Sequence, residues 1–298
     1  MYYPQVLAYC QCILILILCL LSLGSIASIF HSTPLKVIYG RSPVILVILL
    51  SNLVSTLCNL TMASIWGAFL IGWIDRSIQS ATFIMALVSV GRWFIYLHDS
   101  VSIGVILQRI YSICWPLRAF NSNANIVMKI AILILAFLGG LTSLIVSNAW
   151  KVTIRTPEDC YYFSCVGNST YLHFQIQSFL KALYSVVTVV LGIAFLGVLH
   201  YRENKSESAS GQHANKRVNR FVKYTFCLRC GLETIPFFVD LVSNVFFNIY
   251  IGSYLGAYSM QSWTLEVFLC CLSYKFILER NKVTQVSSSG NIRGHANS

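Results

Sequence analysis

Seven apolar stretches, each about as long as a lipid bilayer is thick, dominate this sequence. A helix needs about 20 mainly apolar residues to cross a hydrocarbon core about 30 Å thick. The first stretch contains an uncharged run from Ile13 to Leu21. The stretches cover residues of about 6–30, 43–71, 83–113, 126–147, 173–199, 221–249 and 256–278. We therefore expect an all-α membrane protein, a seven-transmembrane-helix bundle over residues 1–281 followed by a flexible tail over residues 282–298.

The composition excludes the common soluble classes. Of the 298 residues, 56% are hydrophobic and 10% are charged, whereas about a quarter of the residues in an ordinary soluble domain are charged. So few charged side chains do not cover the surface of a soluble globule. This excludes a soluble enzyme, a secreted disulfide scaffold and a disordered regulator.

The Lys and Arg residues near the ends of the stretches predict the orientation, because cytoplasmic loops carry the excess of these residues. With the N-terminus outside and the C-terminus cytoplasmic, fifteen of them lie on the cytoplasmic side and four on the opposite side. The net charge of +11 is then a positive-inside bias, and no nucleic-acid partner is expected. A cleaved signal peptide is the rival interpretation of the first stretch, but no Lys or Arg precedes it and it exceeds the usual length.

The loop after the fourth stretch carries two signs of an extracellular position. Asn168-Ser169-Thr170 is a glycosylation sequon, and only Asn168 among the sequon asparagines faces outward in this topology. Cys160 and Cys165 lie in the same loop, where an oxidising compartment favours a disulfide between them. We expect the other nine cysteines to act as small apolar residues in helix packing.

The segment from Gln108 to Leu117 is the most informative motif. Arg109 stands at the inner end of the third stretch, and Pro116-Leu117 follows seven and eight residues later. This pattern resembles the end of helix three in seven-helix G-protein-coupled receptors. The resemblance implies that Arg109 holds the inactive arrangement and lines the G-protein cavity on activation, and that Leu117 docks into a heterotrimeric G protein. In the alternative interpretation, Arg109 is only an anchor that reaches the lipid headgroups.

The departures from that pattern resemble the nematode serpentine chemoreceptors, and within them serpentine receptor class BC. Gln108 and Ile110 replace the acidic and aromatic neighbours of the arginine, and the sixth stretch keeps Pro236 without the usual tryptophan. A proline within a helix removes a backbone hydrogen bond and produces a kink. The resemblance implies a multi-pass receptor in the cell membrane of a sensory neuron cilium that detects a small environmental molecule.

Ionisable side chains inside the stretches are the candidates for a ligand pocket, since each costs several kcal/mol in a membrane. The ionisable residues inside the stretches are Arg92, His98, Asp99, Lys181, Glu233, Asp240 and Glu266. The pocket candidates among them are Arg92, His98, Asp99, Lys181 and Asp240. In one interpretation they bind a small polar ligand. In the other, Arg92 and Lys181 pair with Asp240, while Asp99 is neutral or hydrogen-bonded to Asn52.

The sequence lacks the features that two other functional classes require. A channel or transporter subunit requires polar residues repeated along a pore or matching interrupted helices, and we find neither in the sequence. An enzyme requires a set such as paired histidines or Ser/His/Asp, and the six histidines do not cluster. We therefore expect no enzyme activity, metal or cofactor.

Overall fold

The computed structural model describes residues 3–41, 43–115, 133–134, 137, 139–141, 156, 160–161, 165, 171–205, 213–247, 249 and 251–276. Within these ranges all regular secondary structure is helical. The elements are α1 (Tyr3–Ser32), α2 (Leu35–Arg41), α3 (Pro43–Leu70), α4 (Ile78–Cys114), α6 (Tyr171–Lys205), α7 (His213–Arg229), the π-helical turn η3 (Cys230–Thr234), α8 (Ile235–Phe247), α9 (Ile251–Leu255) and α10 (Tyr258–Tyr274).

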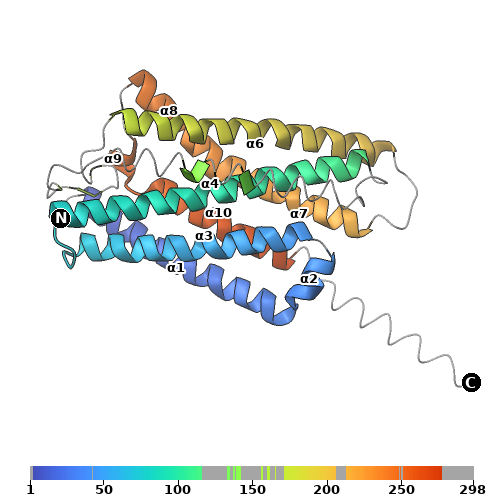
Figure 1. Cartoon of the computed structure of the whole chain (residues 1–298), viewed down its shortest axis with the longest axis horizontal. Coiled ribbons are helices and arrows are strands. Elements are labelled where there is room, and N and C mark those ends of the chain that lie inside the picture. Colours follow the sequence, from blue (N-terminus) through green and yellow to red (C-terminus); the bar gives the residue numbers. More distant parts are fainter. Residues whose placement is uncertain are drawn as a thin grey trace, which may run out of the picture.

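The long helices lie side by side along the long axis of the molecule (Figure 1). α1, α4, α6 and α10 run in one direction, and α3 and the α7–η3–α8 helix run in the other. α1 packs against α3 and α10, and α4 packs between α3 and α6. We call the two ends of this bundle the Gly72 end, where α3 turns into α4, and the Trp115 end, where α4 stops.

Within the described residues, five helices are long and apolar enough to cross a membrane: Gln5–Ser32, Ile45–Leu70, Ile78–Cys114, Ser178–Arg202 and Arg217–Phe247. They match the first, second, third, fifth and sixth predicted stretches, and α10 covers most of the seventh. The chain is therefore compatible with a multi-pass membrane protein. Most of the fourth stretch, 126–147, and the tail, 282–298, lie outside the described residues.

The third helix starts five residues before the predicted residue 83, because Ser77 caps its N-terminus. The Ser77 hydroxyl accepts a hydrogen bond from the backbone N–H of Ser80, at 3.2 Å. Such a cap satisfies one of the N–H groups that a helix start leaves without an internal partner. The helix therefore begins at the cap, outside the apolar run.

Gly72 makes the tight turn between α3 and α4. Its φ of 83° is left-handed, a conformation that glycine adopts without steric cost. The N–H groups of Gly72 and Trp73 donate to the carbonyls of Phe69 and Ala68, at 3.2 and 2.9 Å. This pair of bonds is the Schellman motif that ends many helices.

The sixth long helix changes its hydrogen bonding in the middle, next to Pro236, where the sequence predicts a kink. Pro236 has no N–H to give to the preceding turn. The five residues of η3 lie just before it, and the N–H of Ile235 donates to the carbonyl of Cys230, five residues back. A π turn next to a proline is one of the recognised causes of a helix kink.

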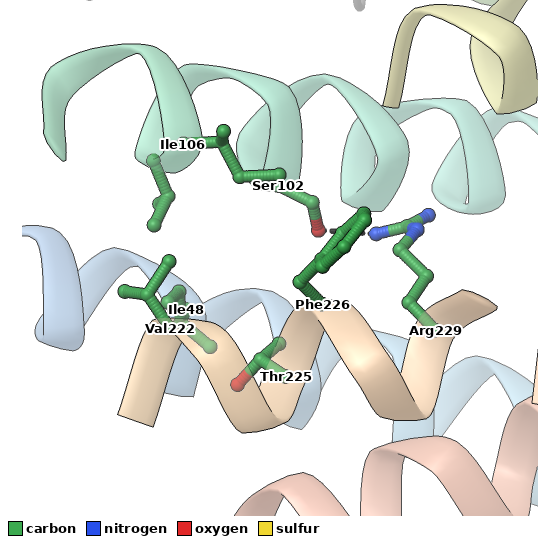
Figure 2. A pocket seen from close by; sticks show the side chains of 8 residues that line it. Ile48, Ser102, Ile106, Val222, Thr225, Phe226 and Arg229 are labelled. Carbon is green, nitrogen blue, oxygen red and sulfur yellow. Dashed lines mark hydrogen bonds between the residues drawn. The ribbon is translucent and has the colours of Figure 1, made fainter. Parts of the chain in front are cut away.

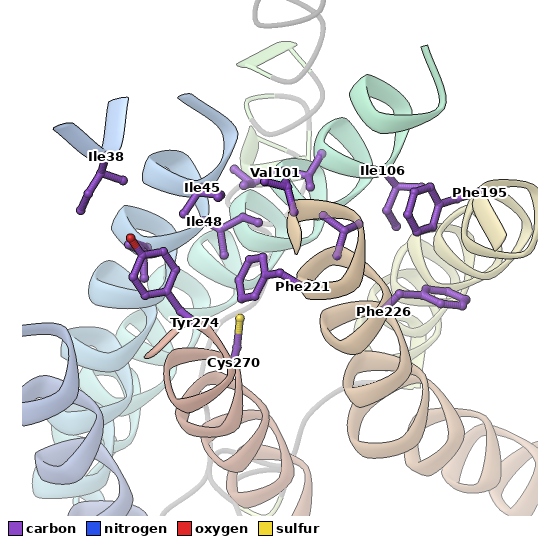
Figure 3. Close-up of a cluster of buried hydrophobic side chains, with 14 of the residues drawn as sticks. Ile38, Ile45, Ile48, Val101, Ile106, Phe195, Phe221, Phe226, Cys270 and Tyr274 are labelled. Carbon is purple, nitrogen blue, oxygen red and sulfur yellow. The ribbon is translucent and has the colours of Figure 1, made fainter. Parts of the chain in front are cut away.

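Two apolar clusters fill the bundle. One lies toward the Trp115 end and contains Ile48, Val101, Ile106, Phe221 and Tyr274 (Figure 3). The other lies toward the Gly72 end and contains Cys12, Trp66, Ile84, Val88 and Met260. Between the two clusters, α3, α4 and α10 bury polar side chains. We call this region the polar layer; its fully buried members include Asn52, Ser55, Asn59, His98, Asp99, Ser100, Thr264 and Glu266.

Candidate functional site: a buried ring of ion pairs

Four charged side chains form a closed ring beside the polar layer, to which one of them, Asp99, belongs. Lys181 of α6 contacts Asp99 of α4, with Nζ and Oδ2 2.9 Å apart, and also contacts Glu233 of η3. Arg229, the last residue of α7, pairs with Asp99, and its Nε lies 3.0 Å from Oε2 of Glu233. Each cation thus faces both carboxylates, and each carboxylate faces both cations. The ring joins α4, α6 and the α7–η3–α8 helix, which we call the kinked helix after the kink predicted at Pro236.

The ring carries no net charge, and its side chains are largely buried. The exposed fractions are 2% for the Asp99 side chain, 3% for Arg229, 9% for Glu233 and 17% for Lys181. Charges in such surroundings are tolerated when they are paired and hydrogen-bonded, and removing one partner leaves a costly unpaired charge. Arg229 also donates to the hydroxyl of Ser102, one turn beyond Asp99 on α4. Lys181 is the member that a molecule from outside the bundle reaches most easily.

Position explains why these side chains meet. Arg229 and Glu233 are four residues apart, so they share one face of the helix, and Glu233 lies inside the π turn. Asp99 and Ser102 are three residues apart on α4 and present the same face to them. The ring therefore holds the π turn directly against α4 and α6.

A second polar contact joins α3, α4 and α10 beside the ring. His98, which precedes Asp99 in α4, shares a hydrogen bond with Ser51 through Nδ1, at 2.9 Å. Its Nε2 lies 3.7 Å from Oε1 of Glu266. Further along α3, the amide of Asn59 donates to the hydroxyl of Thr264, at 3.0 Å. No group of three His, Cys, Asp or Glu side chains in the described ranges is arranged to hold a metal ion.

Arg109 lies toward the Trp115 end of α4 and is buried, with 9% exposed. Ile106 and Ile113, three residues before it and four after it, belong to the apolar cluster at that end. Residues at this spacing share a helix face, so Arg109 faces the interior of the bundle. The predicted alternative, an anchor that extends to the headgroups, does not fit a side chain buried to this extent.

A narrow pocket lies between the ring and this end of the bundle (Figure 2). Ser102 and Arg229 point toward each other at one side of it, and the Phe226 ring lies in front of the hydrogen bond between them in this view. Its volume of about 10 Å³ has room for roughly one water molecule. The lining residues are Ile48, Ser102, Val105, Ile106, Val222, Thr225, Phe226 and Arg229.

The structure brings together only part of the predicted ligand set. Asp99 and Lys181 meet in the ring, and His98 lies beside it. Arg92 lies seven residues before Asp99, about 10 Å along α4. Asp240 lies seven residues beyond Glu233, at the same spacing along the kinked helix. These two predicted residues are therefore about two turns from the ring toward the Gly72 end.

Two predicted pairings are wrong. Lys181 pairs with Asp99 and Glu233 instead of Asp240, because Glu233 lies two turns closer along the same helix. The amide of Asn52 donates to the sulfur of Cys271, at 3.7 Å, and does not bond to Asp99, whose oxygens face Lys181 and Arg229.

Two members of the ring were missed as site residues in the sequence. Arg229 is not among the pocket candidates from the sequence, and Glu233 is named there only as an ionisable residue of the sixth stretch. Their spacing of four residues is the signal that was available, since opposite charges at that spacing pair on a helix.

The structure describes three of the six remaining predicted residues. Cys160 and Cys165 are joined by a disulfide, with their Cα atoms 5.6 Å apart, as the sequence predicted. Pro236 follows the π turn described above. Pro116, Leu117 and Asn168 lie outside the described residues.

A comparison with models of known protein families finds no match to this chain, and a comparison with curated proteins finds none either.

Proposed function

We propose that this chain is a G-protein-coupled chemosensory receptor, a seven-helix protein that binds a small environmental molecule and activates a heterotrimeric G protein. The observation that carries the proposal is the position of the ion-pair ring. It fastens the π turn of the kinked helix to α4, the same helix that carries the buried Arg109. A ligand that disturbs the ring thereby acts on the helix pair that flanks Arg109.

The direction of the helices supports seven spans. α4 and α6 both start at the Gly72 end. The connection from α4 to α6 therefore joins opposite ends of the bundle, as an additional span between these two helices requires. In the proposed topology the Gly72 end and the N-terminus are outside, and the C-terminus and the Trp115 end are cytoplasmic.

In the proposed mechanism, the ligand enters from the Gly72 end and competes for Lys181, the most exposed member of the ring. Arg92 and Asp240 lie on the outer side of the ring and contribute polar contacts. Loss of an ion pair releases η3, and α7 then moves away from α4 about the kink at Pro236. This movement exposes Arg109 to the G protein, and Pro116-Leu117 completes the docking surface.

From the resemblance to nematode serpentine receptors, we propose that the protein resides in the membrane of a sensory neuron cilium. The bilayer is then the partner of the many exposed apolar side chains, such as Leu20, Phe179 and Phe246. A multi-span channel or transporter subunit is the alternative function.

The experiment expresses the chain in cells with a G-protein biosensor and screens volatile and water-soluble odorants. We expect Arg109→Ala to abolish the odorant response while surface expression persists. Arg220→Ala is the matched control, because Arg220 is an exposed arginine of α7 at the same end, and it should respond normally. An unchanged response in Arg109→Ala contradicts the proposed role. An odorant-evoked current in cells that lack G proteins favours the channel alternative.

A further inference from the structure

The ring exposes one of its cations more than either of its carboxylates. Lys181 is the most exposed of the four members, whereas Asp99 and Glu233 are more deeply buried. An ammonium group has three N–H donors and no acceptor. Among the described side chains, the hydrogen bonds of Nζ go to these two carboxylates, which leaves a third donor for an acceptor from outside the ring.

A second cation lies on the same face of α4, toward the Gly72 end. Arg92, Tyr96 and Asp99 follow one another at spacings of four and three residues, so they share one side of the helix. Tyr96 is buried, and the positive charges of both Arg92 and Lys181 act on its hydroxyl group. The two cations therefore share one neighbour, a phenol that lies one turn outward from Asp99.

Two stacked tyrosines join α4 to α6 beside these cations. Tyr184 lies three residues after Lys181 on α6, and its ring stacks on that of Tyr96 with the centroids 5.4 Å apart. The Ser100 hydroxyl donates to the Tyr184 oxygen, at 3.4 Å. A Cβ atom at Gly139 of the fourth stretch would lie 3.0 Å from the same oxygen and 3.2 Å from Cβ of Tyr96. The tyrosine pair is thus held closely, and it places aromatic surface next to two positive charges.

On the basis of the proposed receptor function, we propose that the ligand is an organic carboxylate whose carboxylate group binds between Lys181 and Arg92 while its apolar part packs on the tyrosine pair. A carboxylate accepts hydrogen bonds from an ammonium group and, in bidentate fashion, from a guanidinium group. Charge-assisted bonds of this kind are the strong ones. A ligand bound in this way competes with Asp99 and Glu233 for the same ammonium group.

The same geometry disfavours an amine or an alcohol. An amine in its ammonium form has to reach Asp99 or Glu233, which are more deeply buried than Lys181, and it approaches like charges, which is costly. Asp240, the carboxylate further out on α8, bonds to groups at the start of α9 and α10. An alcohol has no negative charge, so it gains none of the attraction between opposite charges. We therefore expect a carboxylate to bind more tightly than the alcohol or the amine of the same carbon skeleton.

The test measures binding to the purified full chain in detergent, without a G protein, by the shift in Tm. The probes are sodium hexanoate and sodium benzoate, each compared with the alcohol and the amine of the same carbon skeleton at constant pH and ionic strength. We expect both carboxylates to raise Tm and the alcohols and amines to leave it unchanged. Equal shifts for a carboxylate and its alcohol, or no shift with either carboxylate, would overturn the proposal.

Substitutions locate the site. Arg92→Gln and Lys181→Met should each weaken hexanoate binding about tenfold or more, the loss that one charge-assisted hydrogen bond corresponds to. Lys223→Met, which removes an exposed lysine of α7, is the matched control and should bind hexanoate as the wild type does. If Lys181→Met does not fold, Lys181→Met/Glu233→Gln replaces it, since this pair of changes removes one charge of each sign. Unchanged affinity in the Arg92 or the Lys181 variant contradicts the proposed site.

The binding assay and the G-protein assay fail independently. Carboxylate binding that depends on Lys181, without any G-protein response, supports the ligand class and contradicts the receptor function. A G-protein response to odorants that is equal in the wild type and in the Lys181 variant supports the receptor function and overturns the ligand class.

Discussion

Lys181→Met is the perturbation that tests the ion-pair ring most directly. Methionine keeps the length and most of the apolar stem of lysine but removes the charge. Asp99 and Glu233 are then left with Arg229 as their only partner in the ring. The ring changes from neutral to a net charge of −1 while the surrounding helices remain in place.

The expected cost follows from the burial of the ring. Breaking a buried ion pair by removing one partner costs about 3–5 kcal/mol. The 17% exposure of Lys181 admits some solvent, so we expect the lower end, about 3 kcal/mol. At about 2–4 °C per kcal/mol for a chain of 150–250 residues, Tm should fall by roughly 6–12 °C.

The assay is thermal unfolding of the purified protein in detergent, followed by intrinsic fluorescence. Lys223→Met is the matched control, because Lys223 is exposed on α7, and it should stay within about 0.5 kcal/mol of the wild type. Lys181→Met/Glu233→Gln restores a neutral ring with Arg229 facing Asp99. It should be more stable than the sum of the single variants by about 1–2 kcal/mol, as coupled neighbours are. Strictly additive losses would refute the reasoning.

Two further predictions concern the α9–α10 turn and the topology. Gly256 has a φ of 63°, and its backbone lies against the Gln11 side chain. Gly256→Ala should therefore destabilise the fold by about 1–3 kcal/mol. The control is Gly24→Ala in α1, where no side chain lies close; it should be neutral or stabilising by up to about 1 kcal/mol. Both are measured by thermal unfolding, and equal Tm values would contradict the strain. Asn168→Gln should abolish the glycosidase-sensitive gel shift of the chain expressed in eukaryotic cells, and a retained shift would show that the predicted orientation is wrong.

The long helices were predictable because a bilayer sets their length and the apolar runs are continuous. Pro43–Leu70 coincides with the predicted second stretch to within one residue. Ile78–Cys114 does not, because the helix begins at a side-chain cap, Ser77, which hydropathy does not detect. Capping depends on single polar side chains, and these carry little weight in a long apolar window.

The ring was less predictable, because its partners come from three separate helices. Ionisable residues within the spans were recognisable as candidates. Two of the predicted pocket residues, Asp99 and Lys181, are ring members, and Glu233 is a ring member that was not placed in the pocket. Their partners depend on how far each helix is rotated about its axis. Asp240 and Glu233 both lie on the sixth helix, and only the packing of α6 against that helix decides which one Lys181 meets.

Glu233 lies inside the π turn, and the local backbone explains why charges suit this place. A π turn inserts one extra residue into a helical turn, which rotates the residues on either side of it relative to each other. The same turn has weakened backbone hydrogen bonding next to Pro236. Side-chain ion pairs from Arg229 and Glu233 therefore supply the stabilisation that the backbone loses at this point. In the proposed mechanism, a polar ligand that binds beside Lys181 competes with these ion pairs and so acts on the helix next to Pro236.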